Sequence, residues 1–80
     1  MEIQIRYWSV WNYKPQAANL AGELRKTFNV EVKLKPWWVG AFDVIVDGKT
    51  VFAKAQIGRF PTEGEISAII QELQAGTSKN

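Results

Sequence analysis

Residues 2–35, EIQIRYWSVWNYKPQAANLAGELRKTFNVEVKLK, decide the fold. Apolar and polar residues alternate over 2–7, which predicts a strand with one buried and one solvated face. From about residue 14 to 28 the apolar residues recur at helical spacing, and Pro15 fits the first turn of a helix. Residues 30–35 alternate again. The stretch therefore predicts two parallel strands joined by a helix.

Two further strands are expected after this unit. Pro36 ends the second strand, and residues 41–47 alternate as a third. Asp47-Gly48 is a strong signal for a two-residue hairpin turn, because both positions of that turn need a positive φ. The segment KTVFAK, residues 49–54, then forms a fourth strand antiparallel to the third.

A second helix closes the chain. The segment AQIGRFP, residues 55–61, has the glycine and proline of a loop, and Thr62 and Glu65 match a capping box in which each side chain bonds the other's backbone N–H. Gly76 is a plausible stop. The apolar stripe of this helix consists of Ile66, Ile69, Ile70 and Leu73.

The order β-α-β-β-β-α predicts an α+β domain of two layers, with a four-stranded mixed sheet and both helices on one face. Residues 1–76 are expected to form this single domain, and residues 77–80 a polar C-terminal tail. Gly22 lies inside the first helix, where it lowers helix propensity, and we expect it to mark a close approach to the sheet.

Composition excludes several kinds of chemistry. The chain has no cysteine and no histidine, so we expect no disulfide, no metal site, no cofactor and no thiolate or imidazole catalyst. The formal charge is +2 with basic residues scattered, so nucleic acid is not an expected partner. No apolar run could span a bilayer and no signal peptide is evident, so we expect a cytoplasmic protein without a membrane partner.

All four tryptophans fall in two short segments. Trp8 and Trp11 follow the first strand, and Trp37 and Trp38 follow the second. In this topology the loop after the first strand leads into a helix N-terminus, where a redox C-x-x-C would sit because the helix dipole stabilises a thiolate. Trp8 and Trp11 keep that spacing without the sulfur.

Six short motifs are distributed along the chain: I-x-I-R-Y at residues 3–7, N-Y-K-P at 12–15, L-A-G-E-L at 20–24, G-A-F-D-V at 40–44, V-D-G at 46–48 and F-P-T-E at 60–63. With these motifs the chain resembles the SelT/SelW/SelH (Rdx) family of thioredoxin-like proteins, which includes selenoprotein W. The resemblance extends over nearly all of the chain.

The resemblance implies a thioredoxin-like fold and, for the family, thiol or selenol oxidoreductase activity. It also implies cysteine, or cysteine and selenocysteine, at the positions of Trp8 and Trp11, and small or polar residues at those of Trp37 and Trp38. An indole has no redox-active sulfur, so thiol–disulfide exchange is not available here and no catalytic residue is expected. We therefore expect a redox-inactive, engineered or otherwise redox-dead member rather than an enzyme.

The resemblance implies that the loops with Trp8, Trp11, Trp37 and Trp38 lie next to each other at one end of the sheet, where the four indoles would form a cluster. Three roles for this cluster are considered. The leading one is a contact surface for a homodimer or another protein partner, because tryptophan is enriched at interface hot spots. The second is a self-packed cap on a redox-silent scaffold without a ligand. The third is an aromatic pocket for a flat or cationic small molecule. Lys14 and Lys54, close to the start of the first helix, are expected to be solvated.

Overall fold

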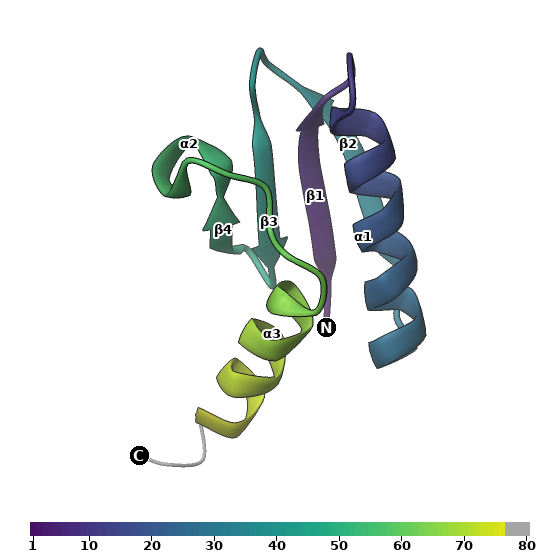
Figure 1. The fold of residues 1–80 in the computed structure, drawn as a ribbon. Coiled ribbons are helices and arrows are strands. Elements are labelled where there is room, and N and C mark those ends of the chain that lie inside the picture. The colour runs from purple at the N-terminus through teal and green to yellow at the C-terminus, as the bar shows by residue number, and fades with distance from the viewer. Residues whose placement is uncertain (77–80) are drawn as a thin grey trace.

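A computed structural model describes residues 1–76 and places its long helices over one face of a four-stranded sheet (Figure 1). The tail expected at 77–80 lies outside the described residues. The elements are β1 (Ile3–Trp8), α1 (Tyr13–Phe28), β2 (Val32–Trp37), β3 (Phe42–Val46), β4 (Lys49–Ala53), α2 (Lys54–Ile57) and α3 (Glu65–Gly76).

The sheet has the order β2-β1-β3-β4. β1 pairs in parallel with β2 and antiparallel with β3, so the sheet is mixed as predicted. The parallel register runs from Ile3 opposite Val32 to Trp8 opposite Trp37. Because parallel strands end at the same edge, the loops that follow β1 and β2 emerge side by side (Figure 1).

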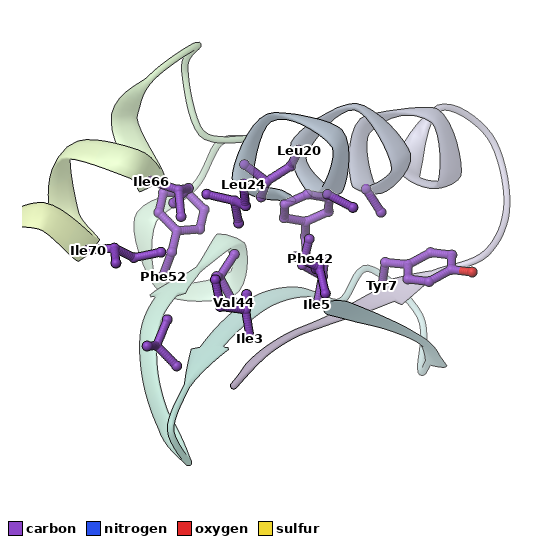
Figure 2. Close-up of a cluster of buried hydrophobic side chains, with 14 residues drawn as sticks. Ile3, Ile5, Tyr7, Leu20, Leu24, Phe42, Val44, Phe52, Ile66 and Ile70 are labelled. Carbon is purple, nitrogen blue, oxygen red and sulfur yellow. The ribbon is translucent and has the colours of Figure 1, made fainter. Parts of the chain in front are cut away.

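The core lies between the sheet and the two long helices. Alternation in β1 buries Ile3, Ile5 and Tyr7, and helical spacing in α1 buries Leu20 and Leu24. Figure 2 shows Phe42 and Ile5 beneath α1, and Ile66 and Ile70 of α3 beside Phe52. The residues of this cluster are Ile3, Ile5, Tyr7, Ala17, Leu20, Ala21, Leu24, Val32, Phe42, Val44, Val46, Phe52, Ile66 and Ile70.

The hairpin between β3 and β4 confirms its sequence signal. Asp47 and Gly48 both have positive φ, 51° and 82°, as a two-residue primed turn requires. Asp47 also joins this end of the sheet to the start of the chain, since its carboxylate accepts a hydrogen bond from the Glu2 N–H at 2.8 Å.

Strand β2 differs from its predicted bounds. It begins at Val32 rather than at residue 30, and it includes Pro36, which was expected to end it. Strand β2 lies at the edge of the sheet, where a proline can stay in a strand because its missing N–H need not pair. The two extra residues bring Trp37 into the sheet, opposite Trp8.

The segment predicted as a loop at 55–61 contains a third, short helix. One turn, α2, runs from Lys54 to Ile57 and ends at Gly58, whose φ of 89° and N–H bond to the Lys54 carbonyl at 2.7 Å stop it. The prediction of two helices was therefore incomplete, because a single turn of four residues has no helical periodicity to detect.

The start of α3 uses half of the expected capping box. The Glu65 carboxylate accepts a hydrogen bond from the Thr62 N–H at 2.9 Å, as predicted. The Thr62 hydroxyl donates to the same carboxylate instead of accepting from the Glu65 N–H, which bonds the Thr62 carbonyl at 3.0 Å. Arg59 completes the arrangement with a two-pronged ion pair to Glu65, at 2.7 and 3.0 Å. The pKa of Glu65 falls to about 2, chiefly because of Arg59.

Gly22 does not approach the sheet, so that expectation was wrong. It lies on the exposed side of α1, and a Cβ added there would have no neighbour within 4 Å. No helix in the described part of the chain is long and apolar enough to cross a membrane.

Candidate functional site

The four tryptophans lie at one end of the sheet. Trp8 is the last residue of β1 and Trp37 the last of β2, and they are register partners. Trp11 and Trp38 lie in the loops that follow these strands. We call residues 8–11 and 37–40 the tryptophan tip.

Trp8 is half-buried and connects the tryptophan tip to the core through aromatic contacts. Its ring lies edge-on to Tyr13, with 5.3 Å between centroids. Tyr13 in turn contacts Phe60 at 4.8 Å, and Phe60 contacts the fully buried Phe42 at 5.1 Å, both edge to face. These are favourable geometries for aromatic pairs, so Trp8 belongs to the packed scaffold as much as to the surface.

Trp37 and Trp38 form a second pair, with ring centroids 4.9 Å apart. Trp37 is half-buried on the open face of the sheet, where the Arg6 guanidinium lies 4.4 Å from its ring centroid. Arg6 is held there by a hydrogen bond from its Nε to the Gln4 side chain at 2.8 Å. A cation over an indole at this distance is attracted by the ring quadrupole.

The structure thus brings Trp8 together with Trp11, at 6.2 Å, and Trp37 together with Trp38. Within residues 1–76, no ring contact joins one pair to the other. The predicted cluster is therefore two neighbouring pairs on adjacent strands, not one stack of four rings.

The outer member of each pair is exposed. Trp11 is 85% accessible and Trp38 is 71% accessible, and their neighbours Val10 and Val39 are 40% and 76% accessible. Four exposed apolar side chains, two in each of the two loops, therefore lie at one end of a small domain. Such a surface is unusual, because exposed apolar patches and exposed tryptophans generally mark a contact site.

Each loop is closed by a backbone turn. The Tyr13 N–H donates to the Val10 carbonyl at 3.3 Å, and the Ala41 N–H donates to the Trp38 carbonyl at 3.1 Å. Gly40 supplies the positive φ of the second turn, 76°, whereas Trp11 itself has a φ of 58° in the first. A bulky residue in this region is strained by roughly 1–2 kcal/mol, which glycine or asparagine would avoid.

Basic side chains surround the tryptophan tip. Lys14 and Lys35 are exposed. Lys54 is half-buried, with its ammonium 5.4 Å from the Tyr13 ring centroid and 5.2 Å from that of Phe60. Lys54 was expected to be solvated, but it is half-buried and its ammonium covers the aromatic contacts. The scattered sequence positions hid this grouping, although the lack of any acidic residue in 3–22 is a signal for it.

Asp43 is the acidic residue of the open face beside these groups. It lies opposite Arg6 in the register of β1 and β3. Burial raises the pKa of Asp43, and the Arg6 charge partly offsets this. Across residues 1–76 no three acidic, histidine or cysteine side chains gather as a metal site would require.

Two surface hollows lie away from the tryptophan tip. One, of about 640 Å³, lies between α1 and the start of α3 and is lined by Leu20, Glu23 and Ser67 among others. The Glu23 carboxylate there accepts a hydrogen bond from the Ser67 hydroxyl at 2.6 Å. The other, of about 290 Å³, lies on the open face, where its lining runs from Glu2 and Gln4 to Arg6 and includes no tryptophan.

The fold and the match to a family profile define the class of protein. The chain belongs to the Rdx family, whose profile matches residues 2–72. Among solved structures, it is similar to the selenoprotein W-related protein from Vibrio cholerae, with a TM-score of 0.83 and 28% sequence identity over 90% of this chain and 94% of that one. The resemblance and the thioredoxin-like fold predicted from the sequence are thereby confirmed. A search of curated proteins finds no match.

Proposed function

We propose that this chain is a redox-silent Rdx domain that works by non-covalent binding through its tryptophan tip, and not by thiol chemistry. The observation that carries the proposal is Trp11, an 85% exposed indole held in a strained backbone conformation. Such a residue contributes little to folding and costs conformational energy. An exposed indole in such a backbone conformation is best accounted for by a contact outside the domain.

Exposure distinguishes this role from the two alternatives. A self-packed cap would cover its own rings, whereas Trp11 and Trp38 are the more exposed ring of each pair. An aromatic pocket would enclose its ligand between the rings, whereas Trp11 and Trp38 are exposed and, in residues 1–76, no ring contact joins the two pairs. Both facts favour a contact surface.

The stability of the double variant Trp11→Ala/Trp38→Ala tests the proposal. If the rings serve contact, their removal changes the free energy of unfolding by less than about 1 kcal/mol, as for exposed positions generally. Urea titration with circular dichroism measures this change. A loss of roughly 3 kcal/mol or more, typical of a buried aromatic, would establish the cap and refute the proposal.

Two further measurements test the form of binding and the lack of redox chemistry. Light scattering over a range of concentrations tests a homodimer: the mass of a dimer, returning to that of a monomer in Trp11→Ala/Trp38→Ala, would identify the second copy as the partner. An insulin disulfide-reduction assay should show no turnover above buffer. Any turnover would contradict the redox-silent part of the proposal.

A further inference from the structure

The apolar residues of the tryptophan tip lie outermost. Val10 and Trp11 occupy one turn, and Trp38 and Val39 the other. Figure 1 shows both loops at the same end of the molecule, away from the C-terminus of α3. The exposed apolar surface is therefore carried on two projecting turns rather than in a groove.

Positively charged side chains lie next to these turns, closer to the middle of the domain, on both faces of the sheet. Lys35 precedes Trp37 by two residues in β2, which sets it back by about 7 Å at the rise of a strand. Arg6 and Lys35 are register partners on the open face. Lys14, in the first turn of α1, and Lys54, over the Tyr13 ring, lie on the helical side.

Positive charge is in excess at this end. One acidic residue, Asp43, lies opposite Arg6 on the open face, where the Arg6 charge acts to lower its pKa. Lys14, Lys35 and Lys54 form no ion pair in the part of the chain that the structure describes, where the salt bridge joins Arg59 and Glu65. Residues 3–22 and 50–62 contain no acidic residue, and Asp43 is the sole one in 32–46. This excess of positive charge favours an occupant that is anionic as well as apolar.

A second copy fits this surface poorly. Twofold pairing through the same patch would bring Lys14 and Lys35 close to their own counterparts, which like charges disfavour. The area is also small. Two indoles offer at most about 500 Å², whereas each partner of a standard stable interface contributes roughly 800 Å².

From this arrangement we infer that the tryptophan tip docks on the surface of an anionic lipid bilayer. The two indoles enter the boundary between headgroups and acyl chains, where tryptophan is favoured because one end of the ring is apolar and the other wet. The lysines set behind them meet the anionic headgroups. A deformable, flat surface accommodates two projecting turns without the matching concavity that a protein would need.

The inference rests on the proposed function, since it names the occupant of the same surface. It departs from the expectation of no membrane partner, which rested on the lack of a spanning segment and of a signal peptide. Peripheral docking requires an apolar surface of modest depth with basic flanks, and no spanning helix.

Vesicle binding by the intact chain tests the inference. Unilamellar vesicles of phosphatidylcholine alone are compared with vesicles that also contain phosphatidylserine, in a sedimentation assay at low and high salt. We expect binding to the serine-containing vesicles, weakened at high salt because the attraction is screened. Tryptophan emission should shift to shorter wavelength and be quenched by lipids brominated in the upper acyl chain.

Variants assign the binding to the tryptophan tip. Trp11→Ala/Trp38→Ala should lower partitioning at least tenfold. Lys14→Gln/Lys35→Gln should lower it about fivefold for each lysine. The charge-matched control, Lys33→Gln/Lys49→Gln, changes exposed lysines toward the other end of the sheet and should bind as the parent does. Ile57→Ala, at an exposed apolar residue outside the tryptophan tip, should also have no effect.

Three results would overturn the inference. They are no partitioning onto serine-containing vesicles, equal partitioning onto both vesicle types, and partitioning that the tryptophan variant leaves unchanged. If vesicles fail to bind while Trp11→Ala/Trp38→Ala keeps its folding stability, the lipid occupant is wrong and the contact surface stands. A protein partner would then be the occupant to seek. If that variant is strongly destabilised, the contact surface itself is wrong.

Discussion

Trp8 and Trp37 are register partners at the ends of neighbouring parallel strands, yet their rings contact different residues. Trp8 packs with Trp11 and Tyr13, whereas Trp37 packs with Trp38 and beneath Arg6. One strand pair therefore carries two aromatic pairs, each with an inner ring that belongs to the scaffold and an outer ring that faces outward. Mutations can therefore measure the contributions of the inner and the outer rings to stability separately.

Trp8→Ala and Trp11→Gly should have opposite effects on stability. Trp8→Ala removes a half-buried ring and its contact with Tyr13, and we expect a loss of about 1–3 kcal/mol in the free energy of unfolding. Trp11→Gly relieves the positive φ and should leave stability unchanged or raise it by up to ~1 kcal/mol. Urea unfolding measures both. A large loss for Trp11→Gly would show that this indole packs on the domain.

Gly22→Ala should stabilise the protein. An added Cβ meets nothing within 4 Å, and alanine loses less backbone entropy than glycine when it enters a helix. We expect a gain of about 0.5–1 kcal/mol, seen as a higher denaturant midpoint at constant slope. A loss of stability would show that the added Cβ meets a neighbour on the outer side of α1, contrary to the open space found there.

Acid should weaken the domain through Glu65. Its pKa is lowered in the folded state from 4.5 to about 2 by Arg59 and by the Thr62 N–H. A lowered folded pKa favours folding while the group is ionised, so the contribution is complete above about pH 4.5 and is lost as the pH falls toward 2. We therefore expect the stability difference between the parent and Glu65→Gln to shrink with acidification over that interval. A difference independent of pH would contradict the ion pair.

Placing cysteines at Trp8 and Trp11, where the resemblance implies the redox motif, tests the family framework. Trp8→Cys/Trp11→Cys places two thiols with C-x-x-C spacing between β1 and the N-terminus of α1, where a thiolate is stabilised. We expect reversible disulfide formation with glutathione as the redox partner, followed by thiol titration. Single-cysteine variants provide the control. Absence of exchange in a folded double variant would show that the second loop, with Trp38, blocks the position.

Much of the fold follows from local pattern in the chain. Ile3, Ile5 and Tyr7 alternate in β1, and Asp47-Gly48 forms the primed turn. These features depend on near neighbours alone. The extension of β2 through Pro36 could not be read in this way, because a proline interrupts a central strand and is tolerated at an edge. Whether β2 lies at an edge depends on the order of the strands in the sheet, which a local pattern does not show.

The candidate site was predicted in part. The family resemblance implied that the four tryptophans lie together at one end of the sheet. It did not imply their division into two pairs, which depends on side-chain direction at the end of each strand. The grouping of basic residues around the tryptophan tip was not predicted, for a related reason. Arg6, Lys14, Lys35 and Lys54 are far apart in sequence and gather only when β1, β2 and the two helices α1 and α2 assemble.

Main-chain hydrogen bonds, rather than side chains, close the two loops of the tryptophan tip. Three hydrogen bonds at this end involve backbone atoms only. The Trp8 N–H donates to the Ala41 carbonyl at 2.8 Å, the Tyr13 N–H to the Val10 carbonyl, and the Ala41 N–H to the Trp38 carbonyl. Side chains at 9–11 and 38–39 can therefore be exchanged with little effect on the layers beneath. Because β1 and β2 are parallel, the two loops that follow them lie side by side at one end of the domain. New recognition sequences can therefore be introduced in both loops while the residues of the core stay the same.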